Sequence, residues 1–361
     1  MSSRLLNVNN KIIGDNYPCF ITFEAGPTHD GLSSALQLVK EASIAGADAI
    51  KFQIFDADKL VADKKQLFSY SILLDKQSNQ TKEISEPLYD ILSRRCLSSQ
   101  EWMQVKSYAD ELDLLFFATI GFEEDLNLLI ELGCHSVKIA SADVNHFPLL
   151  RHAARSGLNI QLDTGNADLD EIKSAVSVIE EEGCNSIIIH QCPSGYPAHT
   201  PSICLNMIKT LRDTFPHYPI AYSDHTPDAD MDIAAVSLGV NLVEKTISMD
   251  RTTPSVEHIF SLEPHDMKKF ITRIREVEVA LGQSIRNISL EQDKARKLIR
   301  RSPYILESVQ AGSFLSDAKV EFCRPGLGLS PADWESYIQL NSRFKQDMSP
   351  GDLISLSTLE N

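Results

Sequence analysis

The residues best suited to chemistry stand at or just beyond the ends of short apolar runs. Glu24 ends the first run, Lys51 and Gln53 occupy alternate positions of the second, and His225 follows the seventh. Alternate residues of a strand share one face, so Lys51 and Gln53 can point to the same side. A lysine inside an apolar strand is costly unless it meets an anion, so this pattern indicates a site for an anionic ligand.

Two further lysines, Lys138 and Lys245, lie inside apolar runs of their own. Together with Lys51 they predict three ammonium groups around one ligand, for which phosphate or carboxylate fits best. An internal ion pair is the alternative for any one lysine, and Lys245 beside Glu244 is the plainest case. Other polar residues that follow the runs are Thr119, Ser141, Asp143, Asp163, Thr164, Ser194, Tyr196 and Ser223.

His225 has three possible roles at the end of its run. An imidazole there can bind a divalent metal, move a proton or hydrogen-bond a loop. The carboxylates Glu24, Asp143, Asp163 and Glu257 favour the metal, because hard divalent ions such as Mn²⁺ or Mg²⁺ accept oxygen-rich sites. Zinc would require more nitrogen or sulfur ligands.

The apolar runs alternate with segments of helical periodicity, which is typical of parallel β/α units. The predicted strands are residues 19–24, 49–54, 114–119, 136–140, 158–162, 186–191, 219–223 and 241–246. Eight β/α units in about 260 residues favour an α/β fold closed as a (β/α)8 TIM barrel, whose C-terminal mouth carries the chemistry. A doubly wound open sheet is disfavoured because no GxGxxG motif follows the first run. The insertion 55–95 should lie over the mouth as a lid or substrate loop.

Composition limits the class of protein. The chain has 361 residues, 43% of them hydrophobic, and a formal net charge of −16, so it is globular and an unsuitable partner for nucleic acid. No run reaches the ~20 apolar residues of a membrane span, and no signal peptide is recognisable. The seven cysteines are scattered, as in a reduced cytoplasmic protein. We predict a barrel domain over 1–282, a linker over 283–300 and a small second domain over 301–361.

Several motifs occur in order along the chain: FEAGPTHDG, GADAIKFQ, VKIASADVNHFPLL, YSDHT, SLEP, and in the tail RRSPYILESVQAG and CRPGLGLSP. By these motifs the chain resembles the sialic acid synthase family. The resemblance implies a TIM barrel followed by an antifreeze-like SAF (β-clip) domain, and a homodimer that swaps this domain. It also implies that phosphoenolpyruvate condenses with the open-chain aldehyde of an N-acylated hexosamine or related six-carbon sugar, and that phosphate leaves by C–O cleavage.

The resemblance also implies roles for single residues. Catalysis falls to Glu24, Lys51, Lys138 and His225, with Glu24 as the acid/base and His225 as a ligand of Mn²⁺ or Mg²⁺. The residues expected to bind phosphoenolpyruvate are Lys51, Thr119, Lys138, Ser141, Ser194 and Ser223. The residues expected to contact the sugar are Gln53, Tyr196, Glu257 and, from the tail of the partner subunit, Arg324.

Three positions depart from the family's pattern. Thr246 replaces a second metal-binding histidine, Asp163 replaces a phosphate-binding serine, and HQCPSGYP puts Gln191 where a histidine is expected. A carboxylate repels phosphate, so we expect Asp163 to be protonated, turned away or a substitute metal ligand. These changes predict an altered metal dependence or a different sugar acceptor.

Two alternatives remain open at this point. One is a related phosphoenolpyruvate-dependent or aldol-type barrel enzyme that acts on another aldose. The other is a degenerate barrel that binds a sugar or an anion without turnover, which the loss of a histidine at Thr246 would allow. Among acceptors, N-acetylmannosamine, a di-N-acylated sugar and unmodified mannose are all compatible with the sequence.

Overall fold

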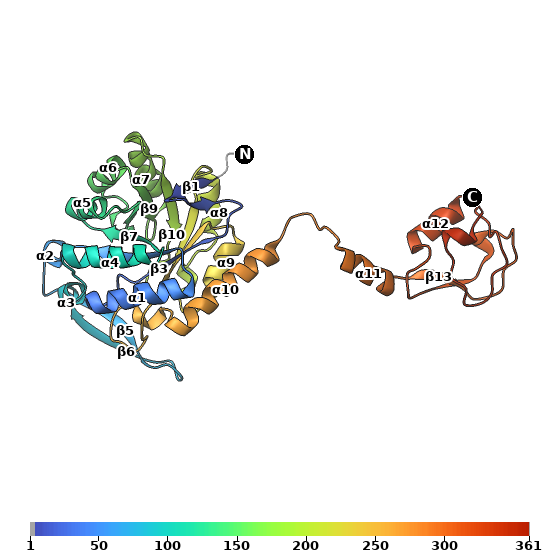
Figure 1. The fold of residues 1–361 in the computed structure, drawn as a ribbon, viewed down its shortest axis with the longest axis horizontal. Helices are drawn as coiled ribbons and strands as arrows, with labels where there is room; N and C mark the ends of the chain where they lie inside the picture. Colours follow the sequence, from blue (N-terminus) through green and yellow to red (C-terminus); the bar gives the residue numbers. More distant parts are fainter. Residues whose placement is uncertain (1–3, 361) are drawn as a thin grey trace. The chain divides into compact units, whose positions relative to one another are not determined.

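The structure is a computed structural model that describes residues 4–360. The chain divides into two compact units, Met1–Gly282 and Gln283–Asn361. Figure 1 shows the first unit as a barrel of strands surrounded by helices. Among the described residues, no helix is both long and apolar enough to cross a membrane.

Eight parallel strands close into a barrel within residues 4–360, and neighbouring strands pair in the order in which they follow along the chain. The strands are β3 (Phe20–Glu24), β4 (Ala49–Ile54), β7 (Leu115–Ile120), β8 (Ser136–Ile139), β9 (Asn159–Asp163), β10 (Ile187–Gln191), β11 (Ile220–Asp224) and β12 (Leu242–Thr246). The barrel closes where β12 pairs with β3, with Thr246 beside Glu24. The predicted (β/α)8 fold is thus confirmed, and each predicted strand lies within about a residue of an observed one.

Helices cover the outside of the barrel. They are α1 (Leu32–Ala45), α4 (Ser99–Glu111), α5 (Glu123–Glu131), α6 (Phe147–Arg155), α7 (Leu169–Glu181), α8 (Met207–Thr214), α9 (Asp230–Ser237) and α10 (Pro264–Leu281). Local sequence sets their ends. The Asp168 side chain caps α7 by accepting from the N–H groups of Asp170 and Glu171, and Gly46 ends α1 in the left-handed region that glycine tolerates.

The interior of the barrel changes from apolar to polar along its axis. At the N-terminal end, Phe20, Phe117, Ile188 and Leu242 pack with Val8 of a hairpin formed by β1 (Leu5–Val8) and β2 (Lys11–Gly14). Two residues further along each strand, the inward positions are polar. The hairpin therefore closes the floor, and polar side chains collect at the mouth.

The insertion after β4 is ordered. It contains α2 (Ala57–Leu60), the hairpin β5 (Leu67–Asp75) and β6 (Gln80–Pro87), and α3 (Leu88–Ser93). Tyr70, Ile72 and Ile91 form a small apolar cluster with Val256, from the loop that follows β12. This packing holds the insertion beside the loops of the barrel mouth.

The second unit has its own core, made of Ile305, Leu315, Leu329, Trp334, Phe344, Met348, Ile354 and Leu359. Its regular elements are α11 (Leu290–Ile299), the antiparallel pair β13 (Ser302–Ile305) and β14 (Val320–Cys323), and α12 (Pro331–Gln339). Helix α11 occupies most of the stretch that we expected to be a linker. The small antiparallel sheet with its separate core is compatible with the expected SAF domain.

Candidate active site

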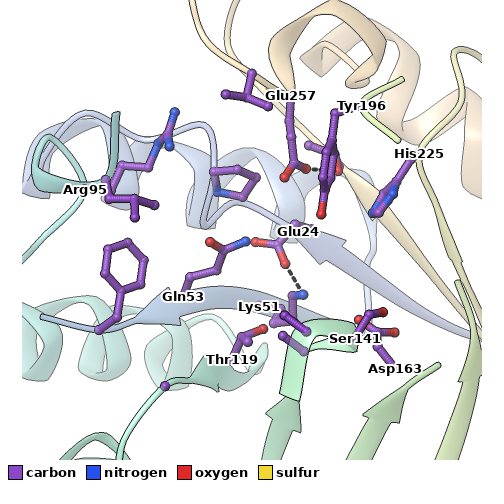
Figure 2. Close-up of a pocket in the computed structure, with 18 of the residues that line it drawn as sticks. Glu24, Lys51, Gln53, Arg95, Thr119, Ser141, Asp163, Tyr196, His225 and Glu257 are labelled. Atoms are coloured by element: carbon purple, nitrogen blue, oxygen red, sulfur yellow. Dashed lines mark hydrogen bonds and ion pairs between the residues drawn. The ribbon is translucent and has the colours of Figure 1, made fainter. Parts of the chain in front are cut away.

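A cavity of about 440 Å³ opens at the C-terminal ends of the barrel strands. Figure 2 shows side chains from many strands and loops converging on it. The predicted site residues that line the cavity are Glu24, Lys51, Gln53, Thr119, Ser141, Asp163, Tyr196, His225 and Glu257. Residues scattered over more than two hundred positions thus face one cavity, as the barrel topology predicts.

Four predicted site residues lie outside this lining. Lys138 and Ser223 are buried directly behind Asp163, to which both side chains bind. Ser194 donates a hydrogen bond to Asn166 Oδ1 at 2.6 Å. Arg324 belongs to the second unit, where it is exposed and precedes Pro325.

A carboxylate joins the two lysines at the inner end of the cavity. Glu244 Oε1 lies 2.8 Å from Lys51 Nζ, and Glu244 Oε2 lies 2.9 Å from Lys138 Nζ. Lys51 also pairs with Glu24, whose other oxygen accepts the Gly26 N–H. Burial alone would raise the pKa of Glu244, but the two ammonium groups outweigh it and hold this pKa well below its usual range. The two ammonium groups are thereby fixed close together.

Lys138 is completely buried and fully satisfied. Its Nζ lies 3.0 Å from Asp163 and 3.1 Å from both Ser223 Oγ and His190 Nδ1. Burial favours the neutral amine, but Asp163 and Glu244 outweigh burial and raise the pKa of Lys138. Asp163 therefore faces a cation rather than turning away. An incoming anion would have to share Lys138 with this carboxylate.

The position of the third lysine contradicts our prediction that all three ammonium groups surround one ligand. Lys245 points out of the barrel, where its Nζ pairs with Asp224 and lies 3.3 Å from Asp232. All three side chains are fully buried, and Lys245 does not line the cavity. The period of two explains the error: Glu244 and Thr246 face inward, so the residue between them faces the helices. Lys245 is held in an internal ion pair, with partners other than the neighbouring Glu244.

The same alternation of inward and outward side chains shows which residue of β10 faces the interior, where the sequence has Gln191 at the position expected for histidine. His190 points into the barrel, where its Nε2 lies 3.0 Å from Gln161 Oε1 and its Nδ1 lies 2.9 Å from Ser223 Oγ. Gln191 points outward and donates to the Ile203 carbonyl. Burial, aided by the charge of Lys138, lowers the pKa of His190 to about 3, so its imidazole is neutral.

His225 directly follows β11 and lines the mouth of the barrel. Its ring is 4.7 Å from the Tyr196 ring and 5.8 Å from the Phe260 ring, centroid to centroid. Its buried Nδ1 has no hydrogen-bond partner among the described residues. Glu257 lies nearby and accepts the Thr246 hydroxyl at 3.1 Å. Burial raises the pKa of Glu257.

Glu244 and Arg95 are charged residues of the cavity lining that we did not predict as site residues from the sequence. Glu244 was named only as a counterion of Lys245, although its spacing of two from Thr246 already places it on the inner face. Arg95 was not named at all. It follows α3 in the insertion, at 6% exposure, and its Nη2 hydrogen-bonds Ser255 Oγ. Nothing local in the sequence shows that this arginine folds inward.

The geometry defines a barrel site with a charged inner end, where Lys51 and Lys138 pair with three carboxylates, and an outer, partly apolar end. Lys51 and the hydroxyls of Thr119 and Ser141 line the inner end and can hold a small anion, with the Lys138 ammonium group buried behind Asp163. Glu24, in contact with Lys51, can exchange a proton beside it. The arrangement suits an enzyme that binds an anionic substrate and a second, mostly neutral one.

Comparison with known proteins identifies the family. The NeuB family model matches residues 38–286. N,N'-diacetyllegionaminic acid synthase of Legionella pneumophila is 32% identical over 352 residues, which is 96% of either chain. N-acetylneuraminate-9-phosphate synthase of Homo sapiens is 28% identical over 278 residues, 76% of this chain and 75% of that one.

Solved structures agree. The N-acetylneuraminic acid synthetase of Leptospira borgpetersenii, crystallised with citrate, superposes with a TM-score of 0.70 at 30% identity and covers 81% of this chain and 95% of its own. The spore coat polysaccharide biosynthesis protein of Bacillus subtilis superposes with a TM-score of 0.65 at 28% identity, and the match covers 99% of both chains. The chain belongs to the NeuB family, and the resemblance to sialic acid synthases is confirmed.

Proposed function

We propose that this protein is a nonulosonic acid synthase that condenses phosphoenolpyruvate with the open-chain aldehyde of an N-acylated six-carbon sugar. The pair of ammonium groups bridged by Glu244, with hydroxyl donors beside it, is the observation that carries the proposal. Phosphoenolpyruvate has a carboxylate and a phosphate close together, which is the ligand that such a pair suits. Relatives named as synthases of legionaminic acid and N-acetylneuraminate 9-phosphate support the product class.

In the proposed reaction, C3 of phosphoenolpyruvate forms a bond to the aldehyde carbon, and the aldehyde oxygen takes up a proton. Water adds to the cationic C2 and loses one proton. The new hydroxyl then loses its proton as the C2 carbonyl forms and the C2–O bond to phosphate breaks, so that inorganic phosphate leaves with the bonding electrons. Lys51 and Lys138 neutralise the charges of the enol ester, and Ser223 and Ser141 position its oxygens. Glu24 is the proposed acid/base, because its carboxylate lines the cavity and pairs with Lys51.

A divalent ion, Mn²⁺ or Mg²⁺, is part of the proposal. Within residues 4–360 the buried Nδ1 of His225 has no hydrogen-bond partner, so its lone pair is available to a metal at the cavity wall. Among the described residues, no cluster of three or more histidine, cysteine or acidic residues could hold a metal. Substrate oxygens and waters would therefore complete the shell, with Asp163 as a candidate ligand. When bound, such an ion acts as a Lewis acid on a carbonyl oxygen.

The acceptor sugar is proposed to contact Gln53, Tyr196 and Glu257 at the outer end of the cavity. By resemblance to the family, we propose a homodimer in which Arg324 of a second copy reaches the sugar. Loss of Arg324 should then weaken acceptor binding without affecting phosphoenolpyruvate. All seven cysteines are free, which agrees with a proposed cytoplasmic location.

A phosphate-release assay tests the proposed function. Purified protein is incubated with phosphoenolpyruvate and N-acetylmannosamine, a di-N-acylated hexosamine, mannose or a five-carbon aldose, each with and without Mn²⁺ or Mg²⁺. Phosphate release that requires both phosphoenolpyruvate and an N-acylated six-carbon sugar supports the proposal, and it should be lost in Glu24→Gln. Turnover only with the five-carbon aldose would assign the protein to another class of condensing enzyme. Binding of the sugars without any turnover would indicate a non-catalytic barrel.

A further inference from the structure

Arg95 is a buried cation that the proposed reaction leaves unassigned. It lines the same cavity, but Figure 2 shows it across the space from Ser141 and Asp163, with Gln53 and Glu24 between. Its side chain has one hydrogen bond, to Ser255, and no ion pair within residues 4–360. The adjacent Arg94 is half exposed and pairs with Glu86 at 2.6 Å. A guanidinium has five N–H donors, so most of those on Arg95 are available to a ligand.

The surroundings of Arg95 restrict that ligand. The cavity wall on the insertion side is apolar and consists of Leu60, Phe68, Leu88, Ile91, Leu92 and Val256. Burial lowers the pKa of Arg95, and the largest opposing influence is the charge of Glu257. A phosphate would be repelled by Glu257 and would find no second cation on this wall among the described lining residues. The wall is therefore better suited to a neutral group that accepts a hydrogen bond and also has an alkyl part.

We propose that Arg95 and the apolar wall form a subsite for an acylamino substituent on the acceptor, on the half of the sugar remote from its aldehyde. The amide carbonyl accepts from the Arg95 guanidinium, and the acyl methyl packs against leucine and isoleucine side chains of α2 and α3. The remote position follows from the order of residues across the cavity, since Ser141, a proposed contact of the enol ester, lies across the space from Arg95 (Figure 2). The inference rests on the proposed function and narrows its acceptor class.

The subsite gives Arg95 a role in specificity rather than in bond making. When a sugar lacks this carbonyl, the buried guanidinium of Arg95 loses its acceptor. Leaving a charged donor unpaired costs about 1.5–3 kcal/mol, or roughly 10-fold to 150-fold in affinity. The preference between two sugars that differ only in this substituent therefore measures the contact directly.

Calorimetric titration of the wild-type protein in the absence of phosphoenolpyruvate provides the test. The ligands are N-acetylmannosamine, the same sugar with a second acetamido group at C4, and its phosphate monoester at C6. We expect the second acetamido group to tighten binding about 10-fold or more and the phosphate to weaken it. Equal affinity for the two neutral sugars, or preference for the phosphate ester, would overturn the subsite.

Variants then assign the preference to Arg95. Arg95→Ala should lose most of the preference for the sugar with the second acetamido group, and Arg95→Lys should retain part of it. The control Arg94→Gln should keep this preference entirely. In turnover assays, Arg95→Ala should raise the KM of the diacylated sugar and leave the KM of phosphoenolpyruvate within about twofold. An unchanged preference in folded Arg95→Ala contradicts the proposal. Because binding is measured without turnover, absence of phosphate release refutes the proposed function separately.

Discussion

Replacing Lys138 by methionine tests the inner end of the cavity most sharply. The change removes a fully buried ammonium group while preserving most of the side-chain volume. It leaves Glu244 and Asp163, at 2.9 and 3.0 Å from the lost nitrogen, without this partner. Breaking a buried ion pair by removing one partner costs about 3–5 kcal/mol, so we expect the melting temperature of the barrel unit to fall by roughly 6–15 °C.

The activity of Lys138→Met should fall far more than its stability explains. With one of the two bridged ammonium groups gone, the anion site retains only Lys51, and phosphate release measured well below the melting transition should drop at least about 100-fold. Lys245→Met is a matched control, because Lys245 is equally buried between two carboxylates but lies outside the cavity. It should lose comparable stability and keep its turnover within about threefold. Residual activity of Lys138→Met within tenfold of wild type would refute the assignment.

Three other outcomes follow from the same geometry. Asp163→Ala should weaken divalent-metal binding in calorimetry if the carboxylate is a ligand, and an unchanged affinity eliminates that role. Since the pKa of His190 is lowered to about 3 from 6.5, the unfolded chain binds a proton that the folded chain refuses, so this residue makes stability fall as pH drops below about 6.5. His190→Gln should make the urea midpoint of unfolding depend less on pH between about pH 7 and 5. If the midpoint of this variant fell with pH as steeply as that of the wild type, a buried neutral imidazole would be contradicted. Arg324→Ala should raise the acceptor KM several-fold and spare phosphoenolpyruvate; an equal effect on both substrates would contradict its proposed contact with the sugar.

The barrel and much of its site were predictable because strand periodicity is a local property. Polar residues at the ends of apolar runs must meet at the mouth once eight such strands close, which is why Glu24, Lys51 and Asp163 were found without coordinates. The same rule, applied strictly, would have placed Lys245 outside and Glu244 inside. That error came from weighing residue type above the position of the residue in its strand.

Other features depend on contacts between distant segments. Arg95 enters the cavity because α3 and the hairpin β5–β6 pack against Val256, some 160 positions later in the chain. The hairpin β1–β2 closes the barrel floor through Val8 and Ile13, which read as an unremarkable N-terminus. How Asp163 resolves its conflict with phosphate also required coordinates, because the carboxylate is balanced by Lys138 from the neighbouring strand.

A crystal structure of the protein with phosphoenolpyruvate tests the central claim most directly. The account predicts electron density for the enol ester at the inner end of the cavity, with its charged groups within hydrogen-bond distance of Lys51 and beside Ser141. The two lysines should remain bridged by Glu244, as they are without ligand. An empty inner end at saturating phosphoenolpyruvate, or density bound elsewhere on the barrel, would contradict it.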